Sequence, residues 1–384
     1  MLAFRCKLIG PLLLITAFLW PVAALACNVP VFRYALERWE PDPYVFVVFH
    51  SQPLTAEQQA LVKALETTSQ DGLANLAAVK VNVSDKMSEP MEALWKSQGN
   101  PALPCVVVRY PPQLRIEQSV WAGPLSAGNI RLLLDSPARR EIARRLMKAE
   151  TSVWLLLESG EKKQDDELAQ MLEAESKRLE KTLELPEQSP MDPEINPNLP
   201  LKIAFSILRV ARSDPAERML ANMLLNCDTN LSAATGPMLF PIFGRGRALP
   251  PAMGEEIRAE ALEAMAGFLT GACSCQVKEM NPGYDLLLAA NWNAALEGGD
   301  LKEVELPPVI GQAQISSAAT SKPTDPPSAP SAAAVTPASL AVAGPAPAES
   351  DNLVRNLLFV LGGGVVVLAI AVFALKATTR KSQP

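Results

Sequence analysis

Two cysteines separated by one residue, Cys273 and Cys275, form the sharpest chemical signal in this chain. Such a pair can close a strained disulfide that is easily reduced, offer two thiolates to a soft metal, or bond separately to other cysteines. The spacing therefore leaves three roles open: structural disulfides, thiol redox chemistry and metal binding.

Three further cysteines could pair with these two. Cys27 directly precedes a predicted helix over Val31–Trp39, and a thiol at a helix N-terminus becomes more acidic, so Cys27 is a third redox candidate. Cys105 lies in a run of valines and is typical of a small buried apolar residue. With Cys227, five cysteines follow the leader. Because this number is odd, one cysteine is left free, lipidated or shared with another chain.

The remaining candidates are fewer. Arg245 and Arg247 in the segment Gly244-Arg-Gly-Arg could bind an anion through their guanidinium groups, although a hairpin turn with solvated arginines is the simpler expectation. His50 is the one histidine of the chain, which excludes multi-histidine metal sites and any Ser-His-Asp triad away from it. No cofactor is expected.

Both ends of the chain predict export and anchoring. Residues 1–26 carry Arg5 and Lys7, an apolar stretch and a small-x-small ending, so we expect a signal peptide cleaved before Cys27 or, alternatively, lipid attachment there. Residues 353–376 contain an uncharged apolar run long enough to span a bilayer once. The basic tail 377–384 predicts a cytoplasmic C-terminus and an extracytoplasmic N-terminal part.

Residues 307–352 are rich in Pro, Ala and Ser and predict a disordered linker. The 384-residue chain has a net charge of −6 and no basic stripe, which disfavours a nucleic-acid partner. The membrane and a protein partner in or at it are the partners that we expect.

Between the leader and the linker, the pattern predicts β-α-β-α-β-β-α twice, in domains 27–150 and 151–306. The first series of expected elements is 44–49, 55–68, 78–83, 90–95, 104–110, 119–122 and a long helix over 127–148. The second series is 153–157, 165–183, 201–210, 214–225, 237–243, a short strand after 247 and a helix over 255–270.

This order, with Pro104 and Pro237 directly ahead of the third strand of each series, resembles the thioredoxin-like fold. The resemblance implies a cis-proline at both positions and a Cys-x-x-Cys between each first strand and its helix. Here those places contain His50-Ser-Gln-Pro53 and Glu158-Ser-Gly-Glu161. Without cysteines there, we expect non-catalytic thioredoxin-like modules.

Three strings also resemble an uncharacterised family of membrane-anchored bacterial proteins: residues 26–39, 240–247 and 273–279. The sequence therefore favours a tethered extracytoplasmic binding or scaffold protein that is not an enzyme. A thiol-disulfide redox protein and a soft-metal-binding protein, both using Cys273 and Cys275, are the alternatives.

Overall fold

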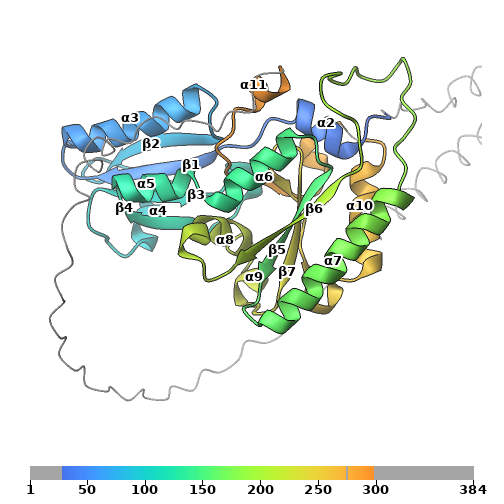
Figure 1. The fold of residues 1–384 in the computed structure, drawn as a ribbon. Helices are drawn as coiled ribbons and strands as arrows, with labels where there is room; N and C mark the ends of the chain where they lie inside the picture. Colours follow the sequence, from blue (N-terminus) through green and yellow to red (C-terminus); the bar gives the residue numbers. More distant parts are fainter. Residues whose placement is uncertain (1–27, 274–275, 298–384) are drawn as a thin grey trace, which may run out of the picture. The chain divides into compact units, whose positions relative to one another are not determined.

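The computed structural model describes residues 28–273 and 276–297 (Figure 1). These residues form two mixed α/β sheets, one of four strands and one of six, so the predicted α/β class is confirmed. The leader, Cys27, Cys275, the linker, the predicted membrane span and the tail lie outside the described residues.

The first sheet has the strand order β2-β1-β3-β4. β1 and β2 run parallel, whereas β3 runs antiparallel to both β1 and β4. The elements of this half are α2 (Val31–Arg38), β1 (Tyr44–His50), α3 (Ala56–Gln70), β2 (Leu76–Asn82), α4 (Glu89–Ser97), β3 (Cys105–Arg109), the 3-10 helix η1 (Pro112–Leu114), β4 (Ser119–Pro124), α5 (Ala127–Leu134) and α6 (Pro137–Met147).

The second sheet repeats this topology. Its order is β10-β8-β7-β5-β6, with β9 paired to β7; β5 and β6 run parallel, and β7 runs antiparallel to β5 and β8. The elements of this half are β5 (Ser152–Glu158), α7 (Lys162–Thr182), β6 (Phe205–Ala211), η2 (Pro215–Glu217), α8 (Arg218–Leu225), α9 (Thr229–Ala233), β7 (Met238–Phe243), β8 (Arg247–Ala248), β9 (Ala252–Met253), η3 (Gly254–Glu256), α10 (Ala259–Thr270), η4 (Lys278–Met280), β10 (Tyr284–Asp285) and α11 (Trp292–Leu296).

Local sequence determines where the helices begin. The Thr-x-x-Gln start of α3 forms a capping box, in which Thr55 Oγ1 accepts from the Gln58 amide at 3.2 Å and Gln58 Oε1 accepts from the Thr55 amide at 3.0 Å. The single helix expected over 127–148 was wrong, because Pro137 disfavours a helical conformation of the residue before it. Ser136 is extended there and caps α6, which makes α5 and α6 separate helices.

Segments from both ends of the described chain lie on the opposite half. The expected boundary after residue 150 falls between the sheets, but α2 packs on α10 of the second half. The Val31 amide donates to the Gly271 carbonyl at 3.0 Å, and Pro30 pairs with Ala272. In the other direction, the Asn75 side chain donates to the Leu286 carbonyl at 3.1 Å. The halves are therefore interlocked.

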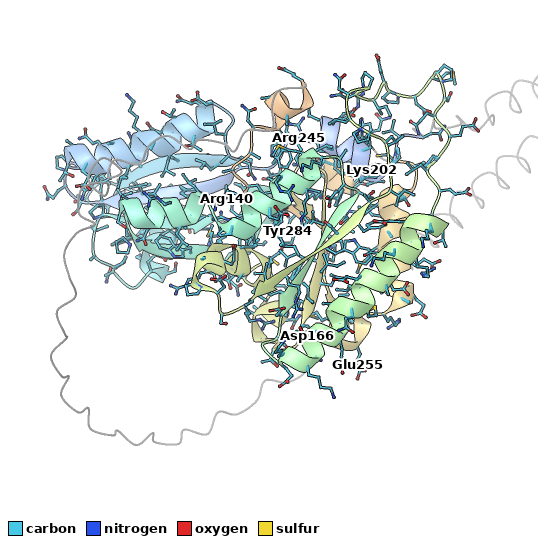
Figure 2. The ribbon with its side chains drawn as sticks, viewed as in Figure 1. Arg140, Asp166, Lys202, Arg245, Glu255 and Tyr284 are labelled. Carbon is cyan, nitrogen blue, oxygen red and sulfur yellow. The ribbon has the colours of Figure 1, made fainter. Side chains whose placement is uncertain are left out.

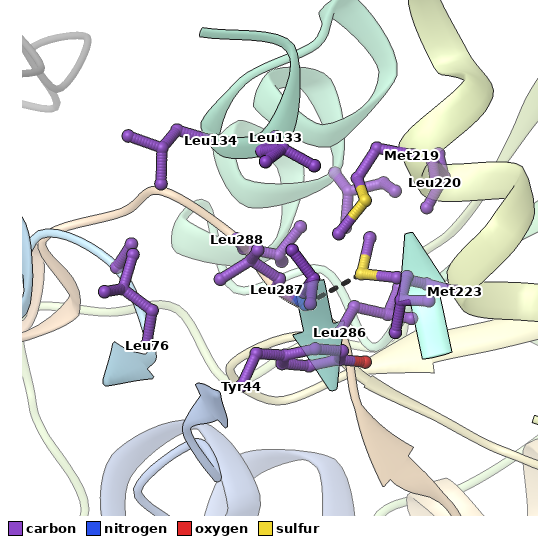
Figure 3. Packing of buried hydrophobic residues seen from close by; sticks show 14 of the residues in the cluster. Tyr44, Leu76, Leu133, Leu134, Met219, Leu220, Met223, Leu286, Leu287 and Leu288 are labelled. Atoms are coloured by element: carbon purple, nitrogen blue, oxygen red, sulfur yellow. Dashed lines mark hydrogen bonds between the residues drawn. The ribbon is translucent and has the colours of Figure 1, made fainter. Parts of the chain in front are cut away.

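The segment after β10 fills the space between the sheets (Figure 3). Leu286, Leu287 and Leu288 are fully buried, and Figure 3 shows them between Leu133 on the side of the first half and Met223 of α8. The Leu287 amide donates to the Met223 sulfur at 3.3 Å. One continuous apolar core therefore serves both halves.

A buried charge network closes this junction. Lys278 Nζ donates to Asp285 Oδ2 at 2.8 Å and forms an ion pair with Asp42 Oδ1 at 2.6 Å. Arg247 Nη1 lies 3.4 Å from Asp285 Oδ1. Burial raises the pKa of the Asp42 carboxyl, and the hydrogen bond from Lys278 opposes that rise.

We expect Asp285→Asn to lower the free energy of unfolding by about 3–5 kcal/mol, because breaking a buried ion pair leaves an uncompensated charge. Urea denaturation followed by circular dichroism measures the change. Asp166→Asn is the matched control: its carboxylate pairs with Lys162 and Arg209 on the surface, and its loss should change stability little. Equal effects of the two variants would contradict a central role for Asp285.

Candidate functional site

The turn after β1, residues 50–53, is the first of the two turns that join a first strand to its helix. This turn contains no cysteine. The His50 ring lies against its own loop, with Nδ1 3.1 Å from the Gln52 carbonyl oxygen. The Leu103–Pro104 peptide bond is cis, and Cys105 follows it at the start of β3. Residues 50–53 therefore carry one imidazole and no thiol.

The equivalent turn after β5 is closed by its own carboxylate. Asp165, which is buried, accepts from the Ser159 amide, the Ser159 hydroxyl and the Gly160 amide at 2.9–3.0 Å. Among the described residues, the bond before Pro104 is the sole cis peptide, so the expectation of a cis bond before Pro237 was wrong. Residues 158–161 contain no cysteine, and the Ser159 hydroxyl is engaged by Asp165.

Cys105 and Cys227 carry free thiols that are poorly suited to redox chemistry. Cys105 is 2% exposed, and burial raises its pKa. Burial also raises the pKa of the Cys227 thiol, which lies 3.5 Å from the Tyr284 hydroxyl. Because the thiolate is the reactive form, both side chains are held in the unreactive one.

Cys273 is buried beside the first described residues of the chain. Its side chain is 1% exposed and packs in a cluster with Val29 and Phe32. Its amide donates to the Val29 carbonyl at 2.9 Å. Residues 29–31 and 271–273 thus run antiparallel to each other through one isolated bridge, and Cys27 and Cys275 lie outside the described residues. Within residues 28–273 and 276–297, no three His, Cys, Asp or Glu side chains form a metal-binding group.

The two arginines considered for anion binding are engaged inside the protein; Figure 2 labels Arg245. Arg245 is 6% exposed; its Nε donates to the Leu36 carbonyl at 2.8 Å and its Nη1 to Glu40 Oε1 at 2.7 Å. Arg247 is also 6% exposed and donates to the Pro282 and Asn281 carbonyls. Their guanidinium groups fasten α2 and η4 to the second sheet, which leaves little capacity for an external anion.

The structure instead shows a cleft of about 350 Å³ on the first half, at the strand end remote from His50. Its floor is Val45 and Val47 of β1, one wall is α4, and the other is the loop between β3 and β4. Ligand pockets typically begin at about 300 Å³, so this cleft holds a few side chains or a small ligand. The lining residues are Val45, Val47, Pro90, Met91, Leu94, Arg109, Tyr110, Pro111, Pro112, Arg115, Ile116 and Glu117.

The cleft exists because a single short helix covers this face of the first sheet. α4 has nine residues, none of them fully buried, and its apolar side chains pack on the small cluster around Val47 and Phe49. The helix at the same topological position of the second half, α8, has five buried residues. The first half packs against α8, where the Asn222 side chain donates to the Val120 carbonyl of β4 at 3.0 Å.

Two guanidinium groups line the cleft. Arg109 donates to the carbonyls of Ile116 and Glu117 and so holds the loop in place. Burial lowers its pKa, while the Glu117 charge opposes that shift. Arg115 is exposed in the left-handed conformation (φ 54°), and no hydrogen bond or ion pair engages its side chain among the described residues. Glu117 is the one acidic lining residue, so the cleft is positive.

Sequence reasoning did not find this cleft, because its residues come from three separated segments. Pro111-Pro112 directly after a strand was the one local signal, and it indicates a loop without indicating a site.

No protein-family model matches this chain, and no curated protein matches it. In the described part of the chain, no helix is both long enough and apolar enough to cross a bilayer.

Cys105 and Cys227 should resist alkylation in the folded protein and react after unfolding, because burial keeps both as thiols. Iodoacetamide labelling at pH 7.5 with and without urea, read peptide by peptide by mass spectrometry, measures this. Rapid labelling of either cysteine without urea would contradict the expectation.

Proposed function

We propose that this chain is a membrane-anchored extracytoplasmic binding or scaffold protein, built on two non-catalytic thioredoxin-like modules. The single observation that carries the proposal is the contrast between two places on the first half. The turn where thioredoxin-like enzymes hold their thiols has none, whereas the opposite strand end carries a ready-made cleft.

The thioredoxin-like assignment is supported by strand order. In each half the second strand lies parallel at one side of the first, the third lies antiparallel on its other side, and the fourth pairs antiparallel with the third. The cis bond before Pro104 agrees with what the resemblance implies for the first module. The trans bond before Pro237 and the closed turn at Asp165 separate the second module further from a catalytic one.

The membrane location rests on the two ends of the sequence. The leader over residues 1–26 predicts export, and the apolar run within 353–376 predicts one span. In this arrangement the linker 307–352 separates the described modules from the bilayer, so their partner is a protein in or at the membrane. The resemblance of residues 26–39, 240–247 and 273–279 to an uncharacterised family of membrane-anchored bacterial proteins agrees with this location.

The alternatives use Cys273 and Cys275. The burial of Cys273 in an apolar cluster and its pairing with Val29 favour a structural role over thiol exchange or soft-metal binding. A redox or metal role would require this segment to become accessible.

Site-specific photo-cross-linking of the full chain in its membrane tests the proposal. A benzoylphenylalanine at Leu94, in the cleft, should form a discrete adduct with a partner protein. The same group at Lys63, exposed on α3 at the other face of the sheet, should form none. Adduct formation should persist when Cys273 and Cys275 are both replaced by Ser.

Loss of the adduct in the double serine variant, together with rapid exchange of one of these thiols with a disulfide substrate, would favour the redox alternative. Stoichiometric copper or zinc retained by the reduced protein would favour metal binding. Absence of any adduct at Leu94 would contradict binding through the cleft.

A further inference from the structure

We propose that the cleft between α4 and the β3–β4 loop binds an extended segment of a partner protein in which a carboxylate side chain lies between apolar ones. This inference rests on the proposed binding function and specifies the chemistry of its partner. It follows from the internal repeat, the apolar lining and the charges of the cleft.

The internal repeat shows how an extended segment can cover a helix at this position. In both halves, a helical connection joins the second strand to the third: α4 in the first, and η2, α8 and α9 in the second, where α8 is the longest of the three. α8 is covered by an extended segment, the edge strand β4, whose Val120 carbonyl accepts from Asn222 at 3.0 Å. The α8 residues Met219, Leu220 and Met223 are buried in the same region of the core.

α4 presents a comparable apolar surface without such a cover in the described chain. Met91 and Leu94 are only partly buried, and they border the cleft together with Val45 of the sheet. Pro111 and Pro112 form the opposite side and lack amide donors, so a strand placed here would be held by side chains more than by backbone pairing. Apolar residues of the occupant would contact these groups.

The charged residues that line the cleft indicate which polar side chain the bound segment would carry. Arg109 and Arg115 line the cleft against one carboxylate, Glu117. Arg109 is already fixed by two loop carbonyls, whereas Arg115 is exposed and unengaged among the described residues. Arg115 can therefore swing onto an incoming carboxylate and form the strong, charge-assisted type of hydrogen bond. A basic occupant would meet repulsion from both guanidinium groups.

The test uses full-length protein in lipid nanodiscs and a phage-displayed library of random dodecapeptides. Selected peptides should contain Asp or Glu flanked by apolar residues, and should lose binding to Arg115→Glu and to Leu94→Asp. Lys63→Glu, which makes the same charge reversal on the exposed α3 surface, should retain them. Thermal melts of each variant check that the fold is intact; if Leu94→Asp does not fold, Met91→Gln replaces it.

The best selected peptide is then compared with its Glu→Gln or Asp→Asn twin by fluorescence anisotropy. The acidic peptide should bind wild-type protein at least about tenfold more tightly, the difference expected for one hydrogen bond to a charged group. In Arg115→Ala that preference should fall to nearly one.

Several results would overturn the inference: no enrichment of peptides, enrichment without acidic residues, or equal binding to wild-type protein and Arg115→Glu. A dimer in light scattering that Leu94→Asp dissociates would show that a second copy occupies the cleft instead. If a partner adduct forms at Leu94 but the selected peptides show no preference for acidic residues, the proposed binding function would stand. The requirement for a carboxylate in the partner would then be refuted. Absence of both would refute the two together.

Discussion

The insertion of residues 285–288 between the two sheets is the constraint on which the rest of the structure depends. Three consecutive leucines are removed from water there, and each contributes about 1.5–3 kcal/mol by burial. Directly before them, the Asp285 carboxylate forms ion pairs with Lys278 and Arg247 of its own half. It also accepts a hydrogen bond from the backbone amide of Asp42 in the other half. Because this segment is shared, neither half keeps its core without the other. The halves are therefore held as one unit through both apolar and ionic contacts.

The elements of this fold were largely predictable from sequence, because each is specified locally. The valine-rich strand 105–109 and the Thr55 cap of α3 carry their signals within a few residues. Pro137 is the local signal for the break between α5 and α6, although the apolar spacing over 127–148 alone predicts one continuous helix. The crossing of α2 to the second half could not be predicted, because nothing within Val31–Arg38 identifies α10 as its neighbour.

The candidate sites illustrate the same limit for function. The sequence identifies Arg245 and Arg247 as cations, but whether a cation is available depends on carbonyls and carboxylates that come from distant segments. Here Leu36, Glu40 and Pro282 supply those acceptors, which converts an apparent anion site into an internal clamp. Arg115 shows the opposite case: no sequence motif marks it as a binding residue, yet its side chain is exposed beside the cleft. Accessibility, which is a tertiary property, decides between these outcomes.

The asymmetry between α4 and α8 links this architecture to binding. A repeated module offers the same helix twice, and an isolated pair of modules would leave both helices half-covered. Packing the first half on the second covers α8, whereas the apolar side chains of α4 pack on the first sheet and remain only partly buried. Exposed apolar surface beside a fixed charge lowers solubility unless it has an occupant, and such surfaces commonly mark interaction sites. Recognition at α4 is the role that we propose for this asymmetry between the two halves.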